Sequence, residues 1–353
     1  MTDYNKAGRV IGLDLGDKES HYCELASVGD EMTEGRVKTT ESALKKQVEQ
    51  WRGARVVMEA GTHSPWVSRL VEAAGAEAVV ANPRKVQLIT RNVKKRDPVD
   101  ARLLARLGRA DVTLLSPLKH RGAATQADLA VIKARDVAVR VRAQLIGHVR
   151  GTVKALGGRI PSCSTASFGA RAAQALPEAL RVALLPLLET IVHLTQQIRG
   201  YDQQIAQWGQ QKYPETKLLT QVKGVGALTS LAYVLTLEHA ERFRHSRAVG
   251  GYLGLHPKRH QSGEQDPSLR ITKAGDAYLR RLLVGSAQYI LGRFGPDSEV
   301  RRWGLQLAAR GGKRGKRRAV VAVARKLAVL LHHLWLTGEV YEPLYQGARE
   351  QAA

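Results

Sequence analysis

The sequence predicts an α/β domain at the N-terminus followed by a mostly helical remainder, and three observations support this prediction. The first 112 residues alternate short apolar runs with amphipathic stretches, as a sheet with covering helices does. Residues 113–214 hold two long stretches in which apolar residues recur every three or four positions, the spacing of helices. Residues 215–345 continue the helical pattern around glycine-rich turns. We therefore expect three regions with these boundaries.

The N-terminal region is expected to begin with three strands, at residues 9–15, 21–28 and 35–40. Helix, strand, helix and strand are expected next, at residues 41–51, 54–58, 64–74 and 76–81. A last helix is expected to begin near Pro98, because proline suits the first turn of a helix. Three strands followed by alternating helix and strand is the order of an RNase H-like sheet, although other α/β folds remain compatible with it.

The middle region predicts two long helices. Residues 123–156 form the first, which is basic. In the second, steps of three and four residues produce a heptad seam, interrupted near its start by Pro186: Leu184, Leu187, Ile191, Leu194, Ile198, Tyr201, Ile205 and Trp208. A hairpin within one chain and pairing between chains both explain this seam. Because a 3.5-residue period favours coiled coils, we expect a coiled coil that makes a homo-oligomer, a dimer or tetramer.

The charge balance indicates a polyanionic partner. The chain carries 55 Lys and Arg against 32 Asp and Glu, a net charge of +23, and residues 220–353 hold 22 basic and 10 acidic side chains. An enzyme of small neutral metabolites has no need of this charge, whereas each phosphate contact adds affinity through released counterions. The N-terminus resembles no signal peptide, and the two cysteines have no metal-ligating spacing. We therefore expect a cytoplasmic nucleic-acid-binding protein without a membrane-spanning segment.

Four carboxylates occupy positions from which they can meet. Asp14 ends the first expected strand, and Glu59 follows the strand at residues 54–58. Asp97 and Asp100 lie three residues apart, which places both on one helix face. Helix capping explains this last pair equally well when it is taken alone.

The four carboxylates as a group favour a metal site. Carboxylates brought together repel by about 1 to 4 kcal/mol per close pair, and a divalent cation removes that penalty. Hard oxygen ligands select Mg²⁺ or Mn²⁺, and two such ions assist phosphoryl transfer. We therefore expect Asp14, Glu59, Asp97 and Asp100 to be catalytic metal ligands.

The C-terminal region contains a candidate nucleophile, Ser262, within a polar loop between clusters of Lys and Arg. A serine that attacks a phosphodiester needs cations to stabilise the charge that develops, and both flanks of the loop supply them. Most Ser-Gly pairs are simply turns, so spacing alone does not identify the nucleophile. Ser268 is close enough in sequence to be a rival.

Two glycine-containing segments are candidates for phosphate contact. Residues 223–226 (KGVG) open a helix, as in helix-hairpin-helix modules, although a plain turn would look the same. Residues 311–318 (GGKRGKRR) are expected to form a flexible basic cluster. The expected nucleic-acid-binding residues are Lys94, Lys95, Arg96, Lys223, Lys258, Arg259, Arg270, Lys273, Arg280, Arg281, Lys313, Arg314, Lys316, Arg317 and Arg318.

An ordered set of motifs along nearly the whole chain resembles the IS110 family of insertion-sequence transposases, which are related to Piv-type DNA invertases. The motifs are IGLD at 11–14, MEAG at 58–61, NP at 82–83, KKRDPVDA at 94–101, GVG at 224–226, GYLGLHP at 251–257, SG at 262–263, ITKAG at 271–275 and LR at 279–280. The family commonly has threonine where this chain has Arg96, and here a proline follows Asp97. Neither departure removes a ligand.

The resemblance implies a RuvC-like domain whose four carboxylates bind Mg²⁺, a coiled coil, and a transposase domain that carries catalytic Ser262. In such enzymes the serine forms a covalent link to DNA, and the acidic domain of one subunit completes the site of another. Donor and target DNA are recognised through a structured guide RNA, the bridge RNA. The resemblance places the protein in the bacterial cytoplasm, associated with the nucleoid.

Three other functions are compatible with parts of the sequence. Residues 12–16 (GLDLG) also occur in actin-like ATPases and sugar kinases, but the second glycine-rich phosphate turn of that class is missing from the middle of this chain. A Holliday junction resolvase would use the four carboxylates without a serine. A DNA-binding protein without catalytic activity would need neither the four carboxylates nor the serine.

Overall fold

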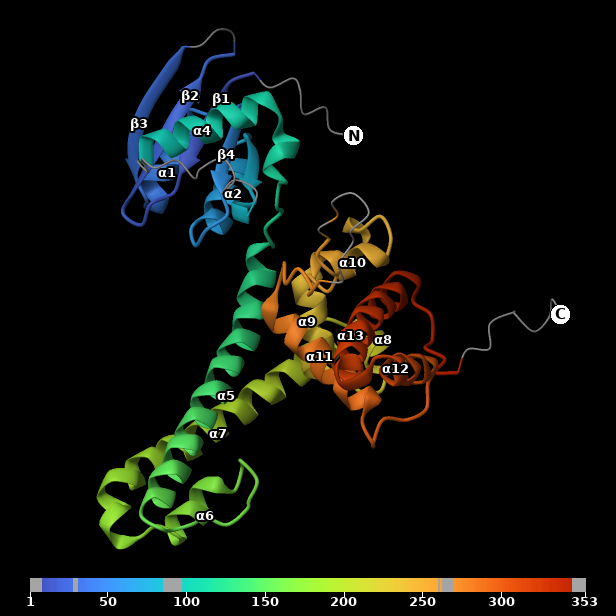
Figure 1. Cartoon of the computed structure of the whole chain (residues 1–353). Helices are drawn as coiled ribbons and strands as arrows, with labels where there is room; N and C mark the ends of the chain where they lie inside the picture. Colours follow the sequence, from blue (N-terminus) through green and yellow to red (C-terminus); the bar gives the residue numbers. More distant parts are fainter. Residues whose placement is uncertain (1–7, 28–30, 85–96, 260, 262–268, 345–353) are drawn as a thin grey trace, which may run out of the picture. The chain divides into compact units, whose positions relative to one another are not determined.

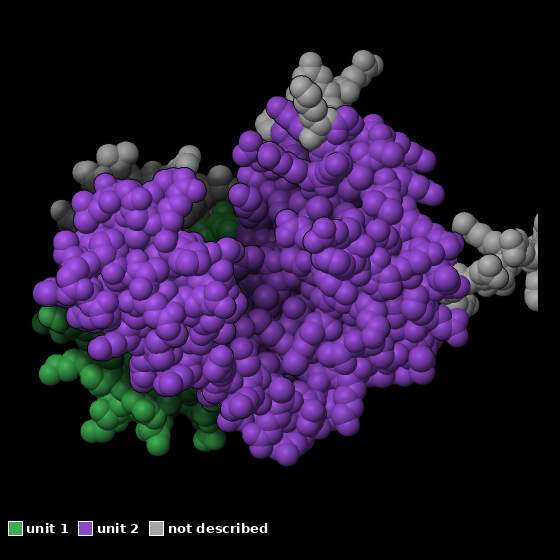
Figure 2. All heavy atoms as spheres, turned by 90° about the horizontal axis from the view of Figure 1, so that it is seen from below, with its two compact units in different colours: residues 1–123 green, residues 124–353 purple. Residues whose placement is uncertain are grey.

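The protein consists of two compact units, residues 1–123 and 124–353 (Figure 2). The computed structural model describes residues 8–27, 31–84, 97–259, 261 and 269–344. The second unit contains both of the helical regions that the sequence predicts. Its division from the first unit lies beyond residue 112, after a short 3-10 helix.

The first unit is a five-stranded sheet with helices on both faces (Figure 1). Its strands are β1 (Val10–Asp14), β2 (Glu19–Leu25), β3 (Met32–Lys38), β4 (Arg55–Glu59) and β5 (Glu77–Ala81). Its helices are α1 (Glu41–Glu49), α2 (Ser64–Ala73), α4 (Asp97–Ala110) and the 3-10 helix η1 (Val112–Leu115). The predicted α/β class is confirmed, and every predicted strand and helix of this region is present, but β2 and β3 begin and end earlier than the predicted 21–28 and 35–40.

The order of strands across the sheet is β3-β2-β1-β4-β5. β1 pairs with β2, and β2 with β3, in antiparallel fashion, whereas β1 pairs with β4, and β4 with β5, in parallel. Ile11 and Met58 pack with α1 and α2 on one face, and Val10 and Val57 pack towards α4 and η1 on the other. The alternation of side chains along a strand produces these two layers.

Helix α4 lies unusually close to β1 because Gly12 has no side chain. A Cβ atom at Gly12 would lie 1.9 Å from the carbonyl oxygen of Ala101 in α4. Farther along the helix, a Cβ atom at Gly108 would meet Val57 and Val10. The start of α4 therefore lies towards the end of β1, and the two elements run in opposite directions.

The second unit begins with an antiparallel pair of long helices, α5 (Ala123–Ala155) and α7 (Glu178–Gln211). The short helix α6 (Phe168–Gln174) packs against α7. Ion pairs and hydrogen bonds join the long helices along their length: Lys212 with Asp128, Arg135 with Asp202, and Arg142 with Thr195. Helix α7 continues through Pro186.

The heptad seam of α7 is buried in part within its own chain. Leu184, Ile191, Ile198 and Ile205 are buried. Leu184, Ile191 and Ile205 belong to clusters that also contain residues of α5. The structure thus shows the hairpin, one of the two explanations of the seam. Pairing between chains stays a prediction.

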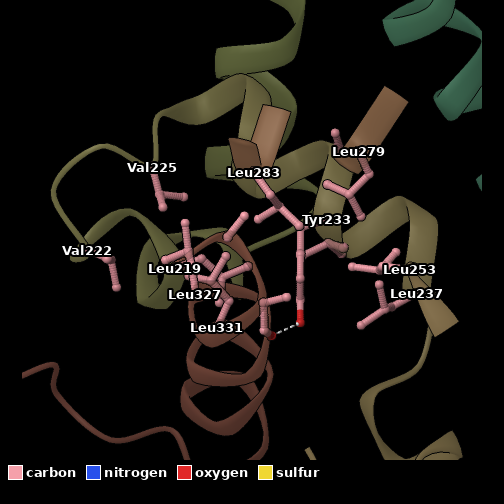
Figure 3. Close-up of a cluster of buried hydrophobic side chains, with 14 of the residues drawn as sticks. Leu219, Val222, Val225, Tyr233, Leu237, Leu253, Leu279, Leu283, Leu327 and Leu331 are labelled. Atoms are coloured by element: carbon pink, nitrogen blue, oxygen red, sulfur yellow. Dashed lines mark hydrogen bonds between the residues drawn. The ribbon is translucent and has the colours of Figure 1, made fainter. Parts of the chain in front are cut away.

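The rest of the second unit is helical, as the sequence predicts, and is built around its last helix, α13 (Gly312–Thr337). The other helices are α8 (Thr216–Thr220), α9 (Ala227–Leu237), the 3-10 helix η2 (Ala240–Arg242), α10 (Arg247–Tyr252), α11 (Ala277–Leu291) and α12 (Glu299–Arg310). The fully buried hydroxyl group of Tyr233 donates a hydrogen bond of 2.6 Å to the carbonyl oxygen of Ala328 (Figure 3). Tyr233 belongs to a buried cluster that includes leucines of α8, α11 and α13.

Residues 314–337 of α13 are long and apolar enough, by length and composition, to cross a membrane. From the sequence we expect no such segment, because no apolar run of about 20 residues follows the basic residues. In the structure Leu327, Ala328 and Leu331 of this helix are fully buried in the core of the second unit. The apolar composition of α13 is therefore explained by its central position.

A buried histidine in this core predicts weaker folding in acid. The ring of His332 is fully buried between the hydroxyl group of Ser246, at 3.0 Å, and the carbonyl oxygen of Ala240, at 2.9 Å. Burial lowers the pKa of His332 below its usual value of about 6.5. Below that pH the unfolded chain binds a proton that the folded chain does not, so the free energy of unfolding decreases with falling pH, by at most about 1.4 kcal/mol per pH unit for this group.

Urea unfolding between pH 8 and pH 5 checks this expectation. The variant His332→Gln, which has no titrating ring, should be less stable at pH 8 but lose less stability on acidification. The same change at the exposed His148 is the control for the substitution itself and should leave the stability at pH 8 close to that of the wild type. Parallel curves for the wild type and His332→Gln would contradict the assignment.

Candidate catalytic and nucleic-acid-binding site

Two of the predicted carboxylates lie side by side at one edge of the sheet. β1 and β4 are neighbouring parallel strands in which Leu13 pairs with Met58, and the next residues are Asp14 and Glu59. Because side chains alternate along a strand, both carboxylates belong to the face on which Val57 packs towards α4. Asp14 is half-buried and Glu59 is exposed.

The first turn of α4 brings the positions of the other two acidic residues to the same edge. Ala101 lies against Gly12, two residues before Asp14, so the first turn of α4 lies near the end of β1. This turn contains Asp100, which is half-buried, and begins at Asp97, whose side chain lies outside the described residues. The fold therefore brings together sequence positions that are more than 80 residues apart.

The donor set fits a hard divalent cation, because carboxylate oxygens are the preferred ligands of such ions. Among the described residues, no three His, Cys, Asp or Glu side chains lie close enough to hold a metal ion. Asp14, Glu59 and Asp100 therefore share one edge of the sheet without forming a closed set of ligands. The attraction of a cation for these like charges would draw them together.

Sequence reasoning did not single out His63, Asp17 and His120, which lie near the same edge. The Nε2 atom of His63, in the loop after β4, is 3.6 Å from the Oδ1 atom of Asp17, in the loop after β1. The Nε2 atom of His120 is 2.8 Å from the hydroxyl group of Ser64. Burial, helped by Arg69 and Arg121, lowers the pKa of His120. The sequence contains only a weak signal for a role of these residues: Asp17 and His63 follow, within a few positions, the carboxylates at the ends of β1 and β4.

In the second unit, a short hairpin closes the segment that contains the predicted nucleophile. The amide of Lys258 donates a hydrogen bond of 2.9 Å to the carbonyl oxygen of Arg270, and the amide of Thr272 donates one of 2.9 Å to His256. The two ends of the segment between Lys258 and Arg270 therefore lie next to each other. Three exposed cations, Lys258, Arg259 and Arg270, are grouped there. Ser262 and Ser268 themselves lie outside the described residues.

Arg280 supports this hairpin from α11. Its guanidinium group donates hydrogen bonds to the carbonyl oxygens of Leu253, Ala274 and Gly275. Arg281, the next residue, forms an ion pair with Asp136 of α5. Two of the cations that the sequence assigned to nucleic acid thus also hold the protein together, whereas Lys273 beside them is exposed.

His256 is a further residue that the sequence analysis did not single out. Its buried Nε2 atom has no hydrogen-bond partner within the described chain. A Cβ atom at Gly250 would lie 3.2 Å from this nitrogen and 3.2 Å from Cγ of Arg325 in α13, so the glycine leaves room for both side chains. Burial, followed by the charge of Arg325, lowers the pKa of His256.

The basic segment at residues 311–318 is helical, which corrects the expectation of a flexible loop. It forms the first turns of α13, because the apolar residues that follow anchor the helix in the core. Arg314, Lys316, Arg317 and Arg318 are exposed, and none of them forms an ion pair in the described part of the chain. Cations at a helix N-terminus oppose the helix dipole, and a bound phosphate would relieve this cost.

The remaining predicted cations divide into two groups. Lys223 is exposed in the turn that precedes α9, where Gly224 has a φ of +97° that favours glycine. Lys94, Lys95 and Arg96, and the side chain of Lys313, lie outside the described residues.

Comparison with known proteins yields family matches in both units. Residues 11–156 match the IS110-type DEDD transposase domain, and residues 216–301 match the domain described as "Transposase IS116/IS110/IS902 family". The transposase for insertion sequence element IS1111A of Coxiella burnetii is 26% identical, over 94% of this chain and 91% of the relative. A protein of Pseudomonas aeruginosa named "Probable family 20 transposase" is 27% identical, over 82% of this chain and 86% of the relative.

Proposed function

Because the chain belongs to the IS116/IS110/IS902 family of transposases, we propose that Ser262 cuts and rejoins DNA with the help of Asp14, Glu59, Asp97 and Asp100. Its activity as an insertion-sequence transposase, an enzyme that acts on DNA, follows from the family. The observation that carries the finer proposal is the convergence of the four acidic positions on one edge of the sheet.

The proposal for the acidic edge rests on fold and chemistry together. The four residues occur along the chain as Asp, Glu, Asp, Asp, which is the order that the name DEDD spells. A DEDD domain implies an RNase H-like fold and the use of a divalent metal, and we assign a RuvC-like role to the first unit. When bound by these carboxylates, Mg²⁺ or Mn²⁺ would supply positive charge to the phosphate oxygens as the reaction proceeds.

Ser262 is proposed as the nucleophile. Its oxygen forms a bond to a backbone phosphorus atom while one phosphorus–oxygen bond of the DNA breaks, so the serine proton leaves and the released strand end gains a proton. A strand hydroxyl group then attacks the phosphoserine and restores the serine. The number of phosphate ester bonds is unchanged, so no energy-rich cofactor is needed. In this proposal Lys258, Arg259 and Arg270, which are exposed at the base of the loop, stabilise the developing negative charge.

We also propose the partners that the resemblance implies: donor and target DNA, a structured guide RNA, and a second copy of the chain. A net charge of +23 suits two kinds of nucleic acid. The exposed side of the α5–α7 pair, which includes Val137 and Val141, is available to a second copy. In such an assembly the acidic edge of one subunit would serve Ser262 of another.

The variant Ser262→Ala tests the serine mechanism. With element DNA, its RNA and Mg²⁺, strand exchange should fall by about a thousandfold or more, because no other hydroxyl replaces the nucleophile. Ser268→Ala is the matched control and should keep most of the activity. Denaturing gels should show a covalent protein–DNA band for the wild type and for Ser268→Ala, but not for Ser262→Ala.

Two results would contradict the serine mechanism. If Ser262→Ala still cuts DNA at the wild-type rate, the enzyme works as a resolvase with its carboxylates alone. If instead only Ser268→Ala abolishes the covalent band, the nucleophile is assigned to the wrong serine.

A further inference from the structure

The loop that joins α11 to α12 exposes an aromatic ring to solvent. The chain has three phenylalanines. Phe168 is buried and Phe243 is half-buried, but Phe294 in this loop is 70% exposed. A single exposed apolar side chain is common on protein surfaces, so the surroundings of Phe294 decide whether it has a function.

The loop around Phe294 is held in a fixed shape. The amide of Gly295 donates a hydrogen bond of 3.2 Å to the carbonyl oxygen of Gly292. The guanidinium group of Arg301 donates hydrogen bonds to the carbonyl oxygens of Ile290 and Gly292. A Cβ atom at Gly295 would lie 2.2 Å from the carbonyl oxygen of Ile290, so only glycine fits this turn. The ring is thus presented by an ordered loop and loses little further freedom when it binds a partner.

The charge next to the ring is positive. The guanidinium carbon of Arg293 lies 4.4 Å from the centroid of the Phe294 ring. Arg293 forms no ion pair with any carboxylate that the structure describes. The acidic residue of the loop, Asp297, is instead held by two nitrogens of Arg302. An aromatic ring beside an arginine without an ion pair suits a ligand that combines a flat ring with a negative charge.

A second aromatic ring and a glycine turn lie on neighbouring elements. Tyr289, in the last turn of α11, is 45% exposed. A Cβ atom at Gly224 would lie 2.9 Å from Cδ1 of Tyr289, so the turn at residues 223–226 lies directly against this ring. A Cβ atom at Gly226 would meet nothing within 4 Å, which leaves the backbone at the start of α9 open. Rings, cations and backbone N–H groups therefore share one region of the second unit.

We propose that Phe294 and Arg293, with Tyr289 beside the Lys223 turn, form a binding site for an unpaired base of the DNA substrate. Bases stack on aromatic side chains whatever their sequence, and the adjacent cations suit the phosphates of the same strand. This inference deepens the proposed function and rests on it only for the nature of the partner. Strand exchange requires bases that have left their original duplex, and this site would hold one of them.

Binding of a fluorescent oligonucleotide by the full chain tests the inference. The probe is single-stranded DNA with one 2-aminopurine, whose fluorescence is quenched by stacking, and the same strand paired in a duplex is the second probe. We expect Phe294→Ala to bind the single strand about 10-fold to 100-fold more weakly and to lose the quenching. Phe294→Trp should retain both, and the affinity for duplex should change little.

The control variant is Val340→Ala, which removes an apolar side chain that is 78% exposed elsewhere in the same unit. It should bind both probes as the wild type does. Because Phe294 is exposed, thermal unfolding of Phe294→Ala should match that of the wild type, which separates a binding defect from misfolding.

The possible failures are distinguishable. If the wild type binds neither probe, the proposed DNA function itself fails. If the wild type binds but Phe294→Ala binds equally well, only the stacking site is refuted. If the variant loses affinity for the RNA form of the probe alone, the assignment to DNA is wrong. If it loses self-association in sedimentation and keeps DNA binding, the patch is a protein interface and the inference is overturned.

Discussion

The variant Asp14→Asn is expected to lower the rate of strand cleavage by about a thousandfold or more, roughly 4 kcal/mol in the activation barrier. Asn keeps the size of the side chain but removes its charge, so folding should be preserved. Asp14 ends β1 beside Glu59 and below the first turn of α4, and its loss removes one of the four proposed ligands. Cleavage of labelled element DNA in Mg²⁺, measured by initial rate, checks the expectation.

Metal binding offers a readout of the same variant that does not depend on activity. Mg²⁺ should raise the Tm of the wild type, because an ion that binds only the folded state stabilises it, and this rise should be smaller in Asp14→Asn. Asp17→Asn is the matched control, because Asp17 lies in the loop that follows β1 and is 93% exposed. If Asp14→Asn cleaves DNA as fast as the wild type, Asp14 is not a catalytic metal ligand and the proposed role of the four carboxylates is wrong.

The largest expected effect on folding belongs to Gly12→Ala. Its Cβ atom would lie 1.9 Å from the carbonyl oxygen of Ala101 and 2.5 Å from the amide nitrogen of Ala105. Both are backbone atoms of α4, so no side chain can move aside and the whole helix must shift. We expect the free energy of unfolding of the first unit to fall by about 3 kcal/mol or more.

Chemical unfolding of Gly12→Ala, with Gly61→Ala as control, measures this effect. A Cβ atom at Gly61 would meet nothing within 4 Å, so the control should unfold like the wild type. A shift of α4 would also carry Asp100 away from the end of β1, so Gly12→Ala should lose Mg²⁺ stabilisation as well. Unchanged stability in Gly12→Ala would mean that α4 does not pack against β1 as described.

The strands and helices of the first unit could be predicted because each has a signal within its own short stretch of sequence. The apolar run before Asp14, the buried pattern before Glu59 and the proline at position 98 each fix one strand or helix. The convergence of the carboxylates could only be suggested, since it depends on β1 and β4 being parallel neighbours and on the direction of α4. The packing of Gly12 against Ala101 supplies that direction.

Other features could not be read from local pattern. The basic run at 311–318 looks like a loop because of its glycines, but the apolar period that follows it places it in α13. The seam of α7 has the same period whether its partner is α5 or another chain. The support of the hairpin by Arg280 depends on residues 27 positions apart, Arg280 and Leu253, meeting in space.

The hairpin at Lys258 and Arg270 has a consequence for how this protein tolerates change. Because the two ends of the intervening segment are pinned at adjacent points, a longer segment would enter and leave the second unit at the same place, at an entropic cost of about 0.6 kcal/mol for each doubling of its length. Insertions or deletions between these anchors would leave the helical scaffold intact.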